Sequence, residues 1–254
     1  MQQKLILITN DDSINSGGIK ALVQIAKQFG EVVVVAPDKA QSGMGHAITI
    51  NHPLRLSSSH VFGDIKAFSC TGTPVDCVKL AIYEVLHRKP DLLLSGINHG
   101  ENTSTNVLYS GTMSAAIEGA MEGIPSIGFS LADYAQDADF TQGAEWISKI
   151  IKKVLDSNLP HNTCLNVNIP KLKKQKIKGT RICKQAHAFW SDRFDKRLDQ
   201  FGNPYYWLTG EFTEVDKRED TDLAVLKQAY ISIVPTHFDL TNHSVIENLK
   251  VFNI

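Results

Sequence analysis

Short apolar runs alternate with amphipathic stretches over the first two thirds of the chain. Residues 5–8 are Leu or Ile throughout, and residues 32–36 are four valines followed by an alanine. Both runs predict strands that are buried on both faces, as in a parallel sheet. Between them, apolar residues recur at helical spacing from residue 17 to Gly30, which predicts an amphipathic helix. The chain therefore begins with a β-α-β unit, in which a right-handed crossover joins two parallel strands.

The same alternation continues to about residue 170. We expect strands at 65–69, 91–95, 124–130 and 164–169, and helices over about 74–87, 110–122 and 142–157. A helix from 222 to about 230 and a strand at 231–234 follow near the end of the chain. Alternating strands and helices predict an α/β fold, with a mostly parallel sheet and helices on both of its faces.

The composition changes after residue 170. Five lysines fall within 171–178, which we interpret as a solvated connection. Eight Phe, Trp and Tyr residues lie within 187–212, interleaved with charged residues. Such a stretch is too polar for a core and too aromatic for a free linker. It predicts a projecting hairpin or arm that packs on another subunit, and a hairpin folded back onto its own domain is the alternative.

The overall composition is that of an ordinary globular protein, with 43% hydrophobic and 21% charged residues among 254. A formal net charge of −1 gives no electrostatic reason to expect a nucleic-acid polymer or a membrane as a partner. The four cysteines form no Cys-x-x-Cys pair, and no signal peptide or membrane-spanning run fits the sequence. We expect a cytoplasmic protein with reduced thiols.

Two adjacent carboxylates, Asp11 and Asp12, follow the first predicted strand. Open α/β sheets place their ligands at the carboxyl ends of the strands, where these side chains fall. Adjacent carboxylates repel each other, and a divalent cation such as Mg²⁺ or Mn²⁺ relieves that repulsion. A solvated turn is the alternative, because Asn-Asp-Asp is also favourable turn chemistry.

Three further loops are expected at the same edge of the sheet. They contain Ser42 with Gly43, Asn98, and the segment Ser110-Gly111-Thr112. Together with the two carboxylates they offer a hydroxyl, an amide and the free N–H groups of a helix start, which suit a hard cation and a phosphate. Each loop also has a plain alternative as a turn or a helix cap.

The sequence offers candidate acids and bases but no motif for a covalent nucleophile. His46 and His99 adjoin these loops, either as acids or bases or as residues of the loop surface. There is no P-loop, no Gly-x-Gly-x-x-Gly after the first strand and no Gly-x-Ser-x-Gly elbow. The first-strand acids also lack the Asp-x-Asp spacing of phosphatases that form a phospho-aspartate. An activated water is therefore favoured as the nucleophile.

Seven short motifs occur in order along nearly the whole chain. They are Thr9-Asn-Asp-Asp12, Val35-Ala-Pro-Asp38, Gln41-Ser-Gly43, Gly72-Thr-Pro-x-Asp-Cys77, Ser95-Gly-Ile-Asn98, Tyr109-Ser-Gly-Thr112 and Asp220-Thr-Asp222. This set resembles the SurE survival-protein family, whose members are metal-dependent 5′-nucleotidases. The resemblance implies a Rossmann-like core and a C-terminal arm that is exchanged between subunits.

The resemblance also implies roles for individual residues. The expected ligands of one divalent metal ion per subunit, Mg²⁺ or Mn²⁺, are Asp11, Asp12, Ser42 and Asn98. The expected substrate-binding residues are Gly43, Asn98, Ser110, Gly111 and Thr112. Asp11, Asp12 and Asn98 are the expected catalytic residues, and one of the two aspartates accepts a proton from a metal-activated water.

Two positions depart from the family pattern. Ser13 stands where the family has glycine, which costs backbone strain if this position requires a positive φ. The segment 101–108 has a single carboxylate, Glu101, where the family has several acidic residues. This segment adjoins the expected site, so it leaves the substrate preference open.

We therefore interpret the chain as one SurE-like domain over 1–254, with a core at about 1–170 and 220–235 and an arm at about 187–212. We expect a phosphoric monoester hydrolase that acts on nucleoside 5′-monophosphates, with 3′-monophosphates as a further option, and that forms a homodimer or homotetramer. A broad phosphatase or exopolyphosphatase and a non-catalytic nucleotide-sensing module are the alternatives. Base preference, native metal and the choice between dimer and tetramer stay open.

Overall fold

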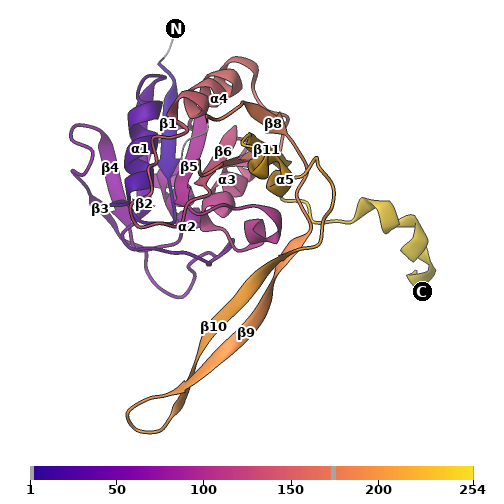
Figure 1. Ribbon diagram of the computed structural model, residues 1–254. Helices are drawn as coiled ribbons and strands as arrows, with labels where there is room; N and C mark the ends of the chain where they lie inside the picture. Colours follow the sequence, from indigo (N-terminus) through magenta and orange to yellow (C-terminus); the bar gives the residue numbers. More distant parts are fainter. Residues whose placement is uncertain (1–2, 173–175, 254) are drawn as a thin grey trace.

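The computed structural model describes residues 3–172 and 176–253, so the middle of the lysine-rich connection at 171–178 lies outside the described residues. One sheet has the strand order β3-β4-β2-β1-β5-β6-β7-β11-β8 (Figure 1). Its strands are β1 Leu5–Thr9, β2 Glu31–Pro37, β3 Leu56–Ser58, β4 Lys66–Cys70, β5 Leu92–His99, β6 Ser126–Leu131, β7 Cys164–Ile169, β8 Thr180–Ile182 and β11 Ile231–Thr236. Strands from β4 to β7 are parallel, whereas β3 and β11 run antiparallel to β4 and β7.

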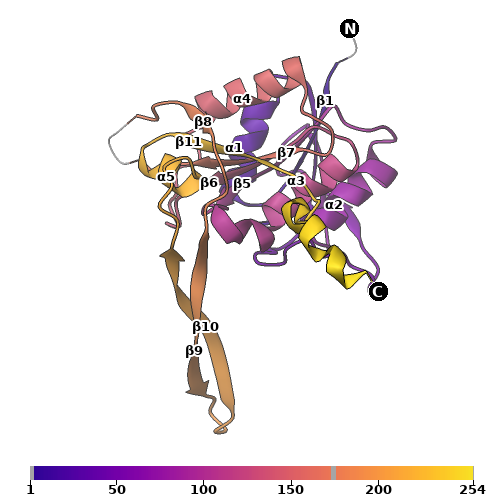
Figure 2. The same ribbon diagram turned by 90° about the vertical axis from the view of Figure 1, so that its right-hand side faces the viewer.

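Helices cover both faces of this sheet. Helices α1 (Gly17–Ala26) and α4 (Ala144–Ser157) lie on one face, as Figure 2 shows. Helices α2 (Pro74–Leu80) and α3 (Gly111–Met121) lie on the other face, and α5 (Asp222–Lys227) packs beside β11. The fold is therefore the three-layered α/β arrangement that alternating strands and helices predict.

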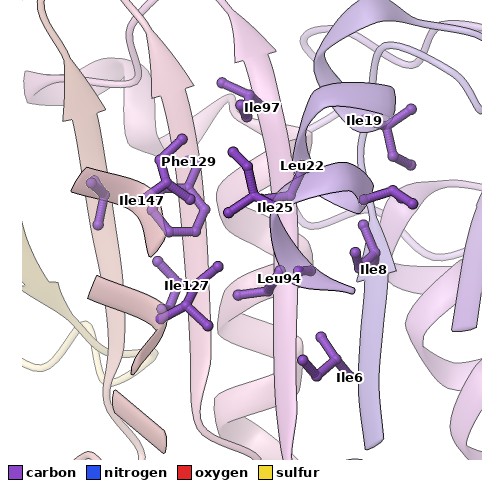
Figure 3. Close-up of a cluster of buried hydrophobic side chains, with 14 of the residues drawn as sticks. Ile6, Ile8, Ile19, Leu22, Ile25, Leu94, Ile97, Ile127, Phe129 and Ile147 are labelled. Atoms are coloured by element: carbon purple, nitrogen blue, oxygen red, sulfur yellow. The ribbon is translucent and has the colours of Figure 1, made fainter. Parts of the chain in front are cut away.

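The largest hydrophobic cluster lies on the face of the sheet that α1 covers, between the strands and this helix. Ile19 and Leu22 of α1 point toward Ile8 of β1 and Leu94 of β5, and all four side chains are buried (Figure 3). The three-residue spacing within α1 puts both of its side chains on the same side of the helix. This packing fixes β1 and β5, the two strands whose ends carry the candidate site.

The order of the strands reverses at β1. The chain passes from β1 to β2 on one side, and β5 later joins the other side of β1. Thr9 at the end of β1 is the register partner of Ser95 in β5. Connections that leave the sheet in opposite directions open a crevice at the carboxyl ends of such neighbouring strands. The loop after β1 and the end of β5 therefore meet at one place.

A long antiparallel hairpin projects from the body (Figure 1). It consists of β9 (Ala188–Leu198) and β10 (Pro204–Glu214), and it exposes large side chains such as Phe194 and Trp207. The C-terminal segment 237–253 also extends away from the sheet, as Figure 1 shows, and exposes several apolar side chains. Within the described ranges, no helix is long and apolar enough to cross a membrane.

The expected α/β fold is confirmed, with three local differences. Strands β3 and β8 were not expected, because three residues are too short to show a period. The strand expected at 91–95 continues to His99, and a register shift between Ser95 and Asn98 lets it follow β6. The helix expected over 74–87 changes at Ala81 into a π-helical turn that ends at Val85.

Candidate metal and phosphate site

A cavity of about 740 Å³ opens at the carboxyl ends of β1 and β5. Its polar end brings together five of the eight residues expected in the site, which are Asp11, Ser42, Gly43, Asn98 and Ser110. The described lining does not include the other three, which are Asp12, Gly111 and Thr112. Each of these three belongs to the same turn or helix start as a lining residue.

Asp11 is deeply buried at this end of the cavity, with only 3% of the residue exposed. The hydroxyl of Thr112 donates a hydrogen bond to Asp11 Oδ1 at 2.5 Å. Burial, and secondly the charge of Asp12, raise the pKa of Asp11 from 3.8 to about 6, although hydrogen bonds from Thr112 oppose the shift. A carboxylate in this environment gains stability when a cation joins it.

Asp12 is held against the end of β5. The backbone N–H of His99 donates to Asp12 Oδ2 at 3.0 Å, and burial raises the pKa of this carboxyl. The charge of the His99 ring opposes this shift without outweighing burial. Among residues 3–172 and 176–253, no Lys or Arg forms an ion pair with either aspartate. Two neighbouring, largely buried carboxylates without a Lys or Arg partner are a donor set that a divalent cation satisfies. The residues present therefore fit such a metal.

Asn98 adds an amide oxygen to this donor set. Its Nδ2 donates to the carbonyl of Gly100 at 2.7 Å, which fixes the orientation of the side chain. Its Oδ1 lies 3.4 Å from the hydroxyl of Thr112, on the side of Asp11. The amide oxygen and the buried carboxylate thus converge on the Thr112 hydroxyl, and both are oxygen ligands of the kind that Mg²⁺ and Mn²⁺ prefer.

Backbone hydrogen bonds bring the loop that carries Ser42 to the same edge. The N–H of Gln41 donates to the carbonyl of Asp11 at 2.7 Å. Four residues later, the N–H of Gly45 donates to the carbonyl of Tyr109 at 3.1 Å. Ser42 lies between these two attachments and is exposed at the cavity. Ser42 therefore borders the space where a cation or phosphate would lie.

The start of helix α3 packs directly on the buried carboxylate. Ser110 is the N-cap, and its hydroxyl accepts a hydrogen bond from the N–H of Met113 at 3.0 Å. A Cβ on Gly111 would lie 2.7 Å from the Cβ of Asp11, so only glycine allows this approach. The positive end of the α3 dipole consequently lies at the polar end of the cavity, where it favours an anion.

The backbone turn after Asp12 is strained at Ser13, as the serine at a family glycine position suggested. Ser13, which stands where the family has glycine, adopts φ +85°. Asn10 stabilises the turn by donating through Nδ2 to the carbonyl of Ser13 at 2.8 Å and to the hydroxyl of Ser16 at 2.9 Å. The positive φ explains why the family has glycine at this position. The two hydrogen bonds from Asn10 stabilise the turn with serine in its place.

The two histidines near the site have different positions. His46 lies outside the described lining of the cavity, where its Nε2 is 2.9 Å from Oε2 of buried Glu118. The other oxygen of Glu118 accepts from Nζ of Lys79 at 2.5 Å. His99 does line the cavity, and its Nε2 lies 2.6 Å from the carbonyl oxygen of Ala135. His46 therefore attaches its loop to α3, whereas His99 lies beside the candidate site.

Part of the cavity lining was not expected from the sequence. Phe189 and Trp190 of β9 and Leu208 of β10 also line the cavity. The dense aromatic content of 187–212 was the one indication in the sequence that this segment contacts something. Its place in the candidate site became visible only in the fold, because these residues lie far along the chain from Asp11.

Comparison with known proteins identifies the family. The family model described as survival protein SurE matches residues 6–192. This chain belongs to the SurE family. Among its SurE relatives, the 5′-nucleotidase SurE of Christiangramia forsetii is 53% identical over 255 residues, which cover 100% of this chain and 98% of that protein.

Two further SurE proteins are also similar to this chain along nearly its whole length. The 5′-nucleotidase SurE of Flavobacterium psychrophilum is 53% identical over 255 residues, which cover 100% of this chain and 99% of that protein. The crystal structure of the SurE protein from Aquifex aeolicus has a TM-score of 0.84 and 40% identity, and the match covers 98% of this chain and 100% of that one. The SurE fold is thus shared along essentially the whole chain.

Proposed function

We propose that this SurE-family chain is a metal-dependent 5′-nucleotidase, which hydrolyses nucleoside 5′-monophosphates to nucleoside and phosphate. Curated relatives at 53% identity over the full chain are named 5′-nucleotidase SurE, which supports this activity. The structural observation that carries the proposal is the contact between the buried Asp11 and the start of α3, because it joins a cation site to an anion site. A phosphate monoester with a divalent cation needs both.

The proposed metal ligands are Asp11, Asp12, Ser42 and Asn98, which would hold one Mg²⁺ or Mn²⁺ per subunit. Three of these residues line the cavity, and Asp12 adjoins them on the loop after β1. When bound, a divalent cation neutralises the two carboxylates, polarises the phosphoryl oxygens and lowers the pKa of a water molecule.

The remaining steps belong to side chains and backbone groups of this chain. Asn98, Gly43 and the helix start at Ser110–Thr112 bind the phosphate and stabilise charge on its oxygens during transfer. One of the two aspartates accepts the proton of the attacking water. The leaving nucleoside oxygen departs on the side opposite the water, as an in-line displacement requires, and takes up a proton from solvent as the P–O bond breaks.

We also propose that the protein is a homodimer or homotetramer, assembled in part through the arm at about 187–212. The hairpin exposes Phe194, Phe201 and Trp207, and the C-terminal segment exposes Leu240 and Val251. Exposed apolar groups of this size support an interface between subunits. The four free, buried cysteines support a cytoplasmic location, where thiols stay reduced.

A substrate panel with the purified protein tests the activity. Phosphate release is measured from nucleoside 5′- and 3′-monophosphates, sugar phosphates and polyphosphate, each with Mg²⁺, with Mn²⁺ and with chelator. The proposal predicts the highest kcat/KM for nucleoside 5′-monophosphates. Preference for polyphosphate or sugar phosphates would instead indicate a broad phosphatase, and nucleotide binding without phosphate release would indicate a sensing module.

A further inference from the structure

The cavity of the candidate site has an apolar end that no step of phosphate chemistry needs. Its large side chains there are Leu108, Tyr109, Tyr134, Phe189, Trp190 and Leu208. The last three belong to β9 and β10, so the projecting hairpin forms one wall of the cavity. The volume of about 740 Å³ is ample for a nucleotide and lies within the usual range of small-molecule sites.

Hydrogen bonds hold the start of β9 in a fixed position. Ser104 Oγ and Thr105 Oγ1 both donate to the carbonyl of Ala188, at 2.7 and 2.8 Å. The fully buried carboxylate of Asp222 accepts from the N–H of Ser104 at 2.9 Å and from the N–H of Ala186 at 3.0 Å. These bonds join the segment before α3 to the start of β9. The first residues of β9 are therefore a preorganised wall, not a free arm.

Trp190 presents a ring surface at this wall. Its indole N–H donates to Oδ1 of Asn106 at 3.0 Å, and its ring centroid lies 5.5 Å from that of Phe212 with an interplanar angle of 56°. These two contacts fix the orientation of the ring. Trp190 nevertheless remains 47% exposed, and its neighbour Phe189 is 41% exposed. An oriented, half-exposed indole beside a phosphate site is a suitable platform for a nucleobase.

The charges around the cavity favour a substrate with a single phosphate. Besides Asp11, the described lining has two acidic residues, Glu101 and Asp192, and it contains no Lys or Arg. A second phosphate group placed toward these carboxylates would be repelled. Ribose hydroxyls, by contrast, are donors that carboxylates accept. The cavity thus suits a neutral nucleoside next to one phosphate at the polar end.

The polar side chains near the wall are mostly engaged with the protein. Thr105 donates to Ala188, Asn106 accepts from Trp190, and Thr209 Oγ1 donates to the carbonyl of Arg193 at 3.1 Å. These side chains therefore offer few hydrogen-bond partners to the edges of a base. The wall instead contacts the flat face of the base, which all bases have. Apolar pockets discriminate between similar groups only weakly, whereas sites built to hydrogen-bond a substrate discriminate strongly.

We infer that Trp190 is the stacking platform for the base of the nucleoside monophosphate, and that this platform accepts purines and pyrimidines alike. The inference rests on the proposed 5′-nucleotidase function and specifies where the nucleoside lies. It assigns to the hairpin a second task, the binding of substrate, which is separate from any role in assembly.

The test compares nucleotides with a phosphate ester that has no base. The variant Trp190→Leu keeps an apolar side chain but removes the stacking surface. It is expected to lower kcat/KM for AMP, GMP, CMP and UMP by about tenfold, mainly through KM, which is the effect of losing one base–aromatic contact. Its kcat/KM for ribose 5-phosphate is expected to stay unchanged. In the unmodified protein, the four nucleotides are expected to differ by less than about tenfold.

Two further variants serve as controls. Trp207→Leu makes the same substitution on β10 at an exposed position outside the described lining, and it is expected to leave all five substrates unchanged. Trp190→Phe keeps an aromatic face and is expected to restore most of the nucleotide activity. An equal loss on ribose 5-phosphate, or no loss on the nucleotides, overturns the assignment.

A binding measurement keeps this test separate from the proposed activity. If the unmodified protein with metal releases no phosphate from any nucleotide, the proposed function fails, and AMP binding is then measured by equilibrium dialysis. Weaker AMP binding by Trp190→Leu than by Trp207→Leu would still support the platform. Equal binding by the two variants would overturn it.

Discussion

The hydroxyl of Thr112 lies 2.5 Å from Oδ1 of Asp11 and donates a hydrogen bond to it. This bond connects the first turn of α3 to the loop after β1. It also fixes the orientation of the buried carboxylate, which is a candidate ligand of the cation. We therefore expect Thr112→Val, which keeps the shape and removes the donor, to weaken Mn²⁺ affinity by about 10-fold to 100-fold, as for other groups that orient a metal ligand. Calorimetric titration of the metal-free protein with Mn²⁺ measures this.

A matched control for this substitution is Thr105→Val. Thr105 donates to the carbonyl of Ala188 and lies at the hairpin wall, away from the carboxylates. The variant Thr105→Val is expected to leave the affinity for Mn²⁺ unchanged. Equal affinities of the two variants for Mn²⁺ would mean that the Thr112 hydroxyl does not position the metal ligand.

The raised pKa of Asp11 predicts a pH-dependent effect of metal on stability. In the metal-free folded protein Asp11 has a pKa of about 6, against an ordinary value of 3.8 for an aspartate in an unfolded chain, so between these pH values the folded state binds more protons than the unfolded state. The contribution of Asp11 therefore lowers the free energy of unfolding as pH rises through this window. A cation binds only the ionised carboxylate, so its binding offsets the loss of folding stability that ionisation of the buried Asp11 causes.

The corresponding measurement is the difference in Tm with and without Mn²⁺ at a fixed free concentration. We expect this difference to be small at about pH 5 and to grow through about pH 7. The variant Asp11→Asn should show a small difference at every pH. A Tm difference that is as large at pH 5 as at pH 7 would contradict the assignment of Asp11 as a ligand.

The close approach of α3 to Asp11 makes Gly111 sensitive to substitution. Gly111→Ala would place its Cβ 2.7 Å from the Cβ of Asp11, so either the helix or the carboxylate must move. We expect kcat/KM for AMP to fall by at least about tenfold, because a small displacement of catalytic groups is costly. Gly17→Ala is the matched control, since its Cβ would meet only Phe140 at 3.4 Å. Similar activities of the two variants would remove Gly111 from the site.

The projecting part of the hairpin can be shortened without touching the cavity. Phe194 and Leu208 are register partners, so residues 195–207 can be replaced by a two-residue Asn-Gly turn. We expect smaller particles by light scattering, with Trp190 and the nucleotide activity retained if assembly and substrate binding are separate tasks. An intact protein that behaves as a 28.1 kDa monomer at micromolar concentration would show that the arm does not assemble subunits.

The parallel core could be predicted because its strands are continuous apolar runs, as in β1 and β2, and a buried parallel strand has that composition. The last strand has a similar, mostly apolar run at 231–234, although it is antiparallel to β7, so the direction of this one strand came only from the structure. Within the site, Asp11 and Asp12 could be predicted as candidate metal ligands because two adjacent carboxylates repel each other unless a cation lies near them.

The nucleoside end of the cavity could not be predicted in the same way. Trp190 and Asn106 are 84 positions apart, and their hydrogen bond depends on how the hairpin returns to the sheet. A high aromatic content shows that a segment contacts something, but it does not identify the partner. The buried Asp222 was visible in a motif, yet its role in joining the hairpin to Ser104 follows only from the fold.

If the two aspartates act through a divalent cation, hydrolysis must depend on that cation. Phosphate release from AMP is measured with protein that has been dialysed exhaustively against EDTA, then assayed alone and with added Mg²⁺ or Mn²⁺. We expect the dialysed protein to be inactive, either metal to restore turnover, and Asp12→Asn to stay inactive at metal concentrations that saturate the unmodified protein. Full activity of the dialysed protein without added metal would show that the aspartates do not act through a cation.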